Sequence, residues 1–328
     1  MKKNVLTLKK IIYTVFISFL SVSCSDRDKI IKAYDSGNFI LAQDLCKPKA
    51  EKNDPKCLYL LGKIAIEGDG TVQNLEEGVK YLKQAADLGH RYAKLNYGMM
   101  ALNGTFSLPT EEAVNYVYEA AKAGLPEAQL GYYTYISGSQ SDKLKDISEE
   151  QEKEANAFLK SAAAKGNQNA MEILAISYCI PVSTQPECGE LGIPMLEKAT
   201  MTDDAFSSNK ILGLIRYTRN EFDKSIEPLK KAAITGDGES AFYLGRIYIA
   251  GKGYKEGYKW VKLAAENGHP DAKKQMEAFM GHGSEFAKLV SDGEVLYKQL
   301  LKIVNYNKMV LKRKAEKKDI RKEFLDKV

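Results

Sequence analysis

The sequence predicts an all-α protein in which pairs of helices stack into a solenoid. One observation is the motif Ala-Ala-x-x-Gly, which occurs five times, each time with a small residue four positions after the glycine. A second is the spacing of that small position, which recurs every 32 to 42 residues when two degenerate copies are included. In chain order the position is occupied by Cys57, Ala93, Ala128, Ala170, Ser208, Ser240 and Ala272. Such a period is typical of helix pairs that bury an apolar core by stacking on one another.

Each repeat reads as two amphipathic helices joined by a glycine turn. The first helix is represented by SAFYLGRIYIAG, residues 240–251, with apolar residues at steps of three and four. Gly251 and Gly253 then turn the chain, because glycine tolerates positive φ. The second helix, YKEGYKWVKLAAENG, residues 254–268, ends at a glycine suited to a helix C-cap.

The residue after that closing glycine differs between repeats. It is a histidine in two of them, His90 and His269, and elsewhere it is Leu125, Asn167 or Asp237. Because the position accepts several residue types, we predict that both histidines are solvated turn residues rather than metal ligands or general bases.

These features together resemble a known repeat family. The pattern A-x-x-x-L-G-x-x-Y-x-x-G-x-G, followed by A-A-x-x-G-x-x-x-A, is similar to the Sel1-like repeat, a branch of the tetratricopeptide superfamily. The resemblance covers residues 53–277, which follow an N-terminal half-repeat in residues 24–52. It implies a right-handed superhelical solenoid that serves as a binding scaffold, with another protein on its concave face. The first helices of the repeats carry many tyrosines that are either core aromatics or part of such a surface: Tyr59, Tyr97, Tyr132, Tyr135, Tyr178, Tyr217, Tyr243 and Tyr248.

Two repeats depart from the family pattern. Tyr133 fills the glycine slot of the third repeat and Ala175 that of the fourth. Both repeats also have longer, irregular loops, at residues 137–153 and 180–194. Despite these departures, the resemblance is a strong indication of the fold. It does not identify the residues that would contact a partner.

The N-terminus reads as an export signal. Residues 1–23 contain four lysines and the apolar run Ile11–Leu20, which is shorter than the roughly 20 residues of a membrane span. The following Ser21-Val22-Ser23-Cys24 resembles a bacterial lipobox, in which Cys24 becomes the lipidated first residue of the mature chain. Ser25 after that cysteine would favour the outer membrane in a two-membrane bacterium, so we predict an outer-membrane lipoprotein facing the periplasm. Cleavage by an ordinary signal peptidase is the alternative.

The remaining cysteines form two close pairs. Because export leads to an oxidising compartment, Cys46–Cys57 and Cys179–Cys188 are the natural disulfides. Four buried free thiols are the alternative, and a zinc site is disfavoured because no histidine neighbours a cysteine.

The C-terminal part departs from the repeat. Residues 278–311 are predicted to form capping helices, with a break at Asp292-Gly293, because a solenoid must cover its last apolar face. The apolar stripe of the second helix is predicted to contain Leu296, Leu300, Ile303, Tyr306 or Asn307, Val310 and Leu311. Residues 312–328 form a basic tail, either a solvated helix or an arm for anionic envelope material or an acidic partner.

The net charge of +5 arises at the two ends of the chain. The first 23 residues carry +4 and residues 298–328 carry +7, which leaves −6 for the remainder. This distribution argues against a nucleic-acid-binding body.

The sequence contains only a partial match to a catalytic motif. Ser207 and Lys210 have the S-x-x-K spacing of serine penicillin-recognising enzymes, and Ser291-Asp292-Gly293 faintly resembles their S-D-N element, but K-T-G is absent. Ser208, next in the chain, is already explained as a repeat position. We therefore predict no catalytic residue, no metal and no cofactor.

Three functions remain on the sequence alone. The leading interpretation is an envelope scaffold or adaptor that binds a protein. An alternative is an immunity or inhibitor protein that neutralises a toxic effector, such as a phospholipase, through the 137–153 and 180–194 loops. The third, an enzyme acting on β-lactams or peptidoglycan, would depend on Ser208.

Overall fold

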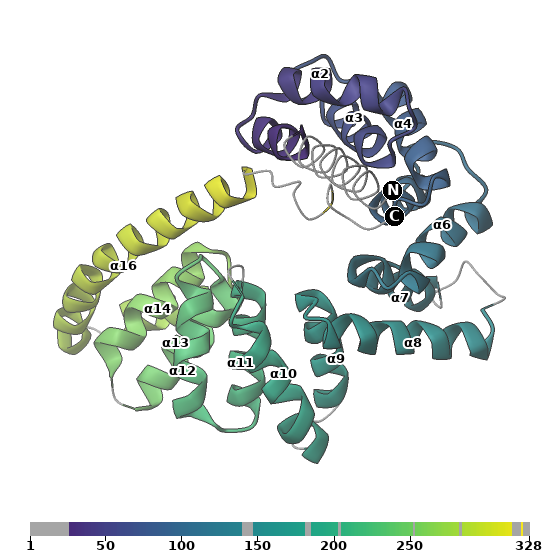
Figure 1. The fold of residues 1–328 in the computed structure, drawn as a ribbon. Coiled ribbons are helices and arrows are strands. Elements are labelled where there is room, and N and C mark those ends of the chain that lie inside the picture. The colour runs from purple at the N-terminus through teal and green to yellow at the C-terminus, as the bar shows by residue number, and fades with distance from the viewer. Residues whose placement is uncertain are drawn as a thin grey trace, which may run out of the picture. The chain divides into compact units, whose positions relative to one another are not determined.

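The computed structural model describes residues 26–139, 147–180, 185–202, 205–251, 253–281, 284–316 and 323. Within these residues the chain is all-α and without strands, as predicted. It divides into two compact units, one made of residues up to Phe158 together with Glu323, the other of residues 159–316 (Figure 1). The predicted signal peptide and Cys24 lie outside the described residues.

The first unit begins with the N-terminal half-repeat and continues with helix pairs. Its helices cover residues 26–35, α2 (Phe39–Ala50), α3 (Pro55–Glu67), α4 (Leu75–Asp87), α5 (Arg91–Leu102), α6 (Thr110–Lys122), α7 (Pro126–Ser139) and the start of α8 (Glu149–Ala164). The helix α3 packs on α4, and α5 packs on α6, the second helix of the same repeat; α4 and α6 then pack on the first helix of the next repeat. The predicted stacking of helix pairs is therefore present in this unit.

The second unit repeats this arrangement and ends in a long helix. Its elements after α8 are α9 (Gln168–Cys179), a π-helical turn (Cys188–Gly192), α10 (Ile193–Ala199), α11 (Phe206–Thr218), α12 (Phe222–Ala233), α13 (Gly238–Ala250), α14 (Tyr254–Glu266), α15 (Pro270–Gly281) and α16 (Ser284–Glu316). The α11–α12 and α13–α14 pairs are closely packed, and α16 lies against α14.

Glycines allow the two helices of a regular repeat to touch through their backbones. A Cβ atom on Gly62 of α3 would lie 3.1 Å from the carbonyl oxygen of Gly78 on α4, and one on Gly78 would lie 2.9 Å from that of Gly62. Gly245 and Gly257 form the same reciprocal contact between α13 and α14, at 3.2 and 3.0 Å. The glycine slot of the motif is therefore a packing requirement, since a side chain there would force the helices apart.

The residue after each closing glycine is the N-cap of the next helix. Its side chain accepts a hydrogen bond from the backbone N–H of the small residue three positions later, which satisfies a donor that the helix itself cannot pair. The caps and their distances are His90 (3.2 Å), Asn167 (3.0 Å), Asp237 (2.8 Å) and His269 (3.4 Å), whereas Leu125 has no side-chain acceptor. Asp54 has the same role (3.2 Å), although it follows Asn53 rather than a glycine. This role explains why the position accepts several residues, because most of them have a side-chain acceptor.

The prediction that the histidines are solvated is wrong for His90. Its side chain is completely buried, and His269 is half-buried. Both rings stack on an aromatic residue of the preceding repeat, His90 on Tyr59 at 4.5 Å between ring centroids and His269 on Phe242 at 4.1 Å. The turn prediction holds for both, and stacking removes His90 from water.

The C-terminal helix differs from its prediction in two respects. The expected break at Asp292-Gly293 is absent, since α16 runs continuously through both residues. Gly293 is instead a contact point, because a Cβ atom there would overlap the ring of Tyr258 on α14. Glu294 accepts a hydrogen bond from the hydroxyl of Tyr258 at 2.7 Å, which fixes the rotation of α16 about its axis.

That rotation decides which apolar residues are covered. Tyr297, Leu300 and Val304 are buried, whereas Ile303 is 51% and Tyr306 62% exposed. The predicted stripe is right for Leu300 and wrong for Ile303, and of the alternatives Tyr306 and Asn307 it is Asn307 that is partly buried. No helix in the described part of the chain has the length and apolar character needed to cross a membrane.

Candidate functional site

A polar cluster lies on the first helices of two neighbouring repeats in the first unit. Tyr59 and Lys63 are one turn apart on α3 and therefore share a face, and Asn96 is on α5. The Asn96 amide donates to the Tyr59 hydroxyl oxygen at 3.0 Å. The Tyr59 hydroxyl donates in turn to Oε2 of Glu323 at 2.5 Å, and the Lys63 ammonium approaches the same oxygen at 2.9 Å. Two donors thus converge on one carboxylate oxygen.

The cluster borders a hollow of about 370 Å³. Its apolar lining consists of Ile66, Leu82, Met99 and Met100, and its polar lining of Lys63, Glu67, Asn96, Asn103 and Glu323. A hollow that combines apolar walls with convergent polar groups is suited to binding a side chain or a short segment.

Burial sets the protonation state of the Tyr59 phenol. The burial of Tyr59 raises its pKa, and the negative charge of Glu323 and its hydrogen bond raise it further. The phenol therefore keeps its proton across the ordinary pH range and remains a hydrogen-bond donor. The ring itself is held by stacking on His90, whose Nδ1 accepts from the N–H of Ala93. His90 is thus a positioning residue for this site.

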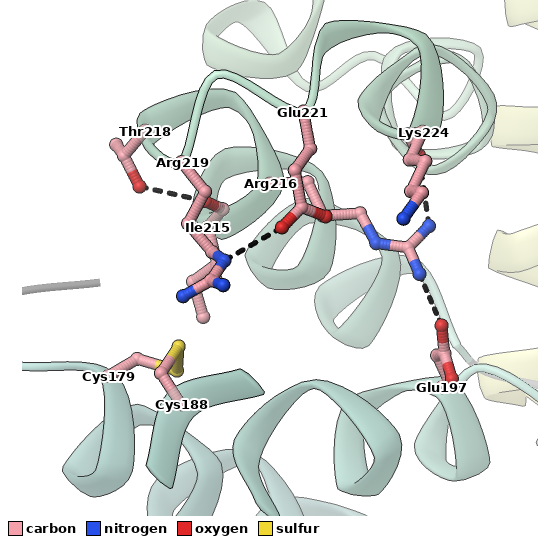
Figure 2. A network of polar contacts seen from close by, with 9 residues as sticks. All are labelled: Cys179, Cys188, Glu197, Ile215, Arg216, Thr218, Arg219, Glu221 and Lys224. Carbon is pink, nitrogen blue, oxygen red and sulfur yellow. Dashed lines mark hydrogen bonds and ion pairs between the residues drawn. A yellow bond between two sulfur atoms is a disulfide. The ribbon is translucent and has the colours of Figure 1, made fainter. Parts of the chain in front are cut away.

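In the second unit a polar network surrounds the irregular fourth repeat. Figure 2 shows Arg216 of α11 directed at Glu197 of α10 and at Lys224 of α12, where it donates to the backbone carbonyl at 3.1 Å. Arg219 donates to Glu221 at 2.8 Å. The hydrogen bond from Arg219 is the main reason why the pKa of Glu221 lies below its usual value. The network fastens α10 and the following helices to the end of α11, which is a structural task.

An apolar hollow of about 400 Å³ also lies in this unit. It is lined by Ile176, Cys179, Ile180, Ile211, Leu214, Ile215 and Thr218. Ile180 is 63% exposed. With few polar groups to orient a ligand, this hollow is less suited to specific recognition than the one beside Tyr59.

The serines of the catalytic alternative are engaged in contacts between repeats. Ser208 is fully buried and donates to Glu172 at 2.5 Å, and Ser207 donates to the other oxygen of Glu172 at 2.9 Å. Lys210 forms ion pairs with Asp237 at 3.1 Å and Glu239 at 2.8 Å, in the next repeat. This geometry gives the S-x-x-K alternative no support.

The tyrosines of the first helices fall into two groups. Tyr59, Tyr97 and Tyr132 are buried in the core, and the others are partly buried. Their aromatic rings therefore contribute mainly to packing, and the Tyr59 hydroxyl contacts Asn96 and Glu323, which line the hollow.

The cysteines lie in the two pairs that the sequence suggests. Cys46 and Cys57 have Cα atoms 5.0 Å apart, and Cys179 and Cys188 have Cα atoms 4.5 Å apart, both disulfide distances. In the described residues no three or more His, Cys, Asp or Glu side chains gather in a way that could hold a metal ion.

These observations define a class, the proteins built from stacked helix-pair repeats. Four segments match the Sel1 repeat, at residues 55–90, 91–125, 127–167 and 238–269. The chain thus contains Sel1 repeats, as its motifs predict.

Solved structures agree with this assignment. A protective antigen of uropathogenic Escherichia coli strains that displays an SLR fold superposes with a TM-score of 0.65 at 17% identity, over 83% of this chain and 59% of the antigen. A Sel1 repeat protein from Oxalobacter formigenes gives a TM-score of 0.59 at 22% identity, over 73% of this chain and 99% of that protein. At these identities the likeness concerns the fold.

A curated relative comes from Neisseria meningitidis serogroup B. It is an uncharacterized protein, 25% identical over 242 residues, which cover 72% of this chain. The match spans 48% of the relative, so this chain corresponds to about half of that protein's length.

Proposed function

We propose that this protein is an exported scaffold that binds another protein through its Sel1 repeats and has no catalysis of its own. The observation that carries the proposal is the hollow beside Tyr59, where two donors from α3 converge on a side chain of a different segment. A surface that already holds one polypeptide side chain has the chemistry needed to hold that of a partner. Sel1 repeats, which are generally non-catalytic scaffolds, support the same conclusion.

We further propose that the scaffold acts in the bacterial envelope and is anchored by lipid on Cys24. The lysine-rich N-terminus, its short apolar run and the lipobox-like Ser21–Cys24 support export. The two cysteine pairs at disulfide distance also suit an oxidising compartment. We propose that both pairs are oxidised in the mature protein and that the outer membrane is the destination.

Crosslinking in intact cells, followed by capture of the full chain from envelope fractions, tests the scaffold function. We expect a partner that is recovered with the wild type and lost with Lys63→Glu, which reverses the charge at the hollow. Lys80→Glu, an exposed position on α4, is the matched control and should retain the partner. Recovery of no specific protein by the wild type would contradict the proposal. The identity of the partner separates an adaptor from an inhibitor of a toxic effector.

Fractionation of a Cys24→Ser variant tests the anchor. We expect the wild type in the membrane fraction and the variant in the soluble fraction of the periplasm. Unchanged membrane association of the variant would contradict lipidation at Cys24.

A further inference from the structure

Glu323 belongs to the C-terminal segment of the chain, but it is bound within the first compact unit. Its carboxylate oxygen receives the Tyr59 hydroxyl at 2.5 Å and the Lys63 ammonium at 2.9 Å. The partners are not equally buried. Tyr59 is completely buried, whereas the side chains of Lys63 and Glu323 are 20% and 26% exposed. The receiving groups are therefore part of the fold, and the carboxylate enters from its surface.

The receiving groups are built independently of Glu323. The Tyr59 ring is fixed by His90 and its hydroxyl oxygen by Asn96, and Lys63 follows one turn later on the same helix. Without Glu323, the buried phenol would lose the carboxylate that accepts its hydrogen bond, and Lys63 would keep only the more distant Glu67, at 4.0 Å. A preformed pair of donors of this kind favours a negatively charged ligand atom.

The charge of the tail makes it a poor match for this site. Residues 312–328 contain eight Lys or Arg and four Asp or Glu, a net charge of +4. Glu323 itself is preceded by Arg321 and Lys322. Positive neighbours of this kind oppose the approach of the segment to Lys63. An acidic residue in a segment without them would bind the same donors with less repulsion.

We propose that the hollow beside Tyr59 is the binding site for an acidic side chain on a partner protein, and that Glu323 occupies it in the free protein as a replaceable internal ligand. This inference rests on the proposed scaffold function and adds the chemistry of the partner. Tyr59 and Lys63 bind the carboxylate, and the apolar wall contributed by Ile66, Met99 and Met100 accepts an apolar neighbour. Binding of the partner displaces the Glu323 carboxylate from Tyr59 and Lys63.

The proposal is tested with the full chain and one defined probe. The probe is a fluorescein-labelled peptide of residues 312–328, and its binding is measured by fluorescence anisotropy. Glu323→Lys places a positive charge opposite Lys63 and should empty the hollow. We expect this variant to bind the peptide about tenfold or more tightly than the wild type, whose hollow is occupied. Adding Lys63→Gln to Glu323→Lys should abolish the gain. Thermal unfolding of each variant shows that it is folded.

A second peptide, with Glu323→Gln, separates specific docking from general attraction of a basic peptide to an acidic body. Its net charge is one unit more positive than that of the first, because a carboxylate is lost, so general attraction predicts equal or tighter binding. The proposed site predicts binding about tenfold weaker, because the carboxylate is missing. Equal binding of the two peptides overturns the proposal, and so does equal or absent binding by wild type and Glu323→Lys. If that happens while the wild-type chain still captures its partner, the site is wrong and the scaffold function stands.

Discussion

The first and fourth repeats hold their helices together in different ways. In the first repeat α3 and α4 meet at Gly62 and Gly78, whose backbones are in direct contact. In the fourth repeat Ala175 fills the slot, and the close approach is supplied from the other side by Gly192. A Cβ on Gly192 would lie 3.1 Å from the carbonyl oxygen of Ala175 and 2.8 Å from the sulfur of Cys179.

The fourth repeat adds polar contacts and a cysteine pair at disulfide distance, which the first does not use between its paired helices. Cys179 and Cys188 connect the end of α9 to the π-helical turn, and Arg216 ties α10 to α11 and α12 (Figure 2). The second half of this repeat is also short, since α10 has seven residues. The comparison suggests that a repeat with a reduced second helix depends on local links, whereas a regular repeat depends on backbone packing.

Removal of the Cys179–Cys188 link is expected to have the largest effect. A double change to alanine should lower the free energy of unfolding by about 2–3 kcal/mol, the chain-entropy value for a loop of about ten residues. Chemical denaturation measures the loss, and hydrogen exchange should locate increased opening in residues 185–199.

The matched control is the double alanine variant of Cys46 and Cys57. It removes a loop of similar size, but Gly62 and Gly78 still hold α3 and α4, so opening should be confined to the α2–α3 hairpin. If hydrogen exchange increased to the same extent and over equally large regions in the two variants, the proposed difference between the first and fourth repeats would be contradicted. Four alkylated cysteines after unfolding without reductant would show that the pairs are free thiols.

A single methyl group on Gly78 tests the backbone packing of the first repeat. Gly78→Ala places a Cβ atom 2.5 Å from the Ile66 side chain and 2.9 Å from the Gly62 carbonyl oxygen. We expect a loss of about 2 kcal/mol in the free energy of unfolding, within the usual range for overpacking. Gly138→Ala on α7 is the control, because nothing lies within 4 Å of its new atom. That variant should be neutral or slightly more stable, and equal losses at both positions would refute the packing argument.

Much of this architecture could be predicted from the sequence, because the repeat period, the glycine slot and the small position all report on helix packing. The contact between an N-cap side chain and a residue of the preceding repeat was not predicted, although the sequence carries a signal for it. Where the cap is a histidine, an aromatic residue follows the preceding small position by two, as Tyr59 does for His90 and Phe242 for His269. Lys210 occupies the equivalent position before Asp237 and forms an ion pair with it.

Other features have no local signal in the sequence. Glu323 is 264 positions from Tyr59, and nothing in either segment identifies the other as its partner. The rotation of α16 is set by contacts such as that of Glu294 with Tyr258, rather than by its own apolar pattern. The candidate site therefore required the structure, while the scaffold that presents it did not.

The cap at Asp237 gives a smaller and pH-dependent effect. Burial alone would raise the pKa of Asp237, but hydrogen bonds from Ser240 and the ion pair with Lys210 outweigh it and hold the pKa below its usual value. The carboxylate thus contributes stability above the ordinary pKa of about 3.9, and this contribution is lost as the pH falls through the lower folded-state value.

Asp237→Ala is therefore expected to cost about 1 kcal/mol at pH 7, with the difference from the wild type shrinking below about pH 4. Unfolding in denaturant at several pH values measures it. Asn167→Ala removes an uncharged cap of the same geometry and should show a loss that does not change over this range. A loss at Asp237 that is independent of pH would mean that the charge is unimportant.

The smallest effect is expected in the polar network of the fourth repeat, at the Arg219–Glu221 pair. The two side chains are 22% and 26% exposed, and the pair joins residues close in sequence rather than separate helices. Arg219→Gln should cost about 0.5 kcal/mol at neutral pH, as partly exposed ion pairs generally do. Because Arg219 lowers the pKa of Glu221, the difference from the wild type should vanish as the pH falls below about 4.

Arg216→Gln is the variant to compare with Arg219→Gln, since Arg216 is 15% exposed and links three helices. A larger loss of unfolding free energy for Arg216→Gln would show that the fourth repeat is held by bridges between helices rather than by surface charge. Equal losses for the two variants would contradict a special role of the arginine network in this repeat.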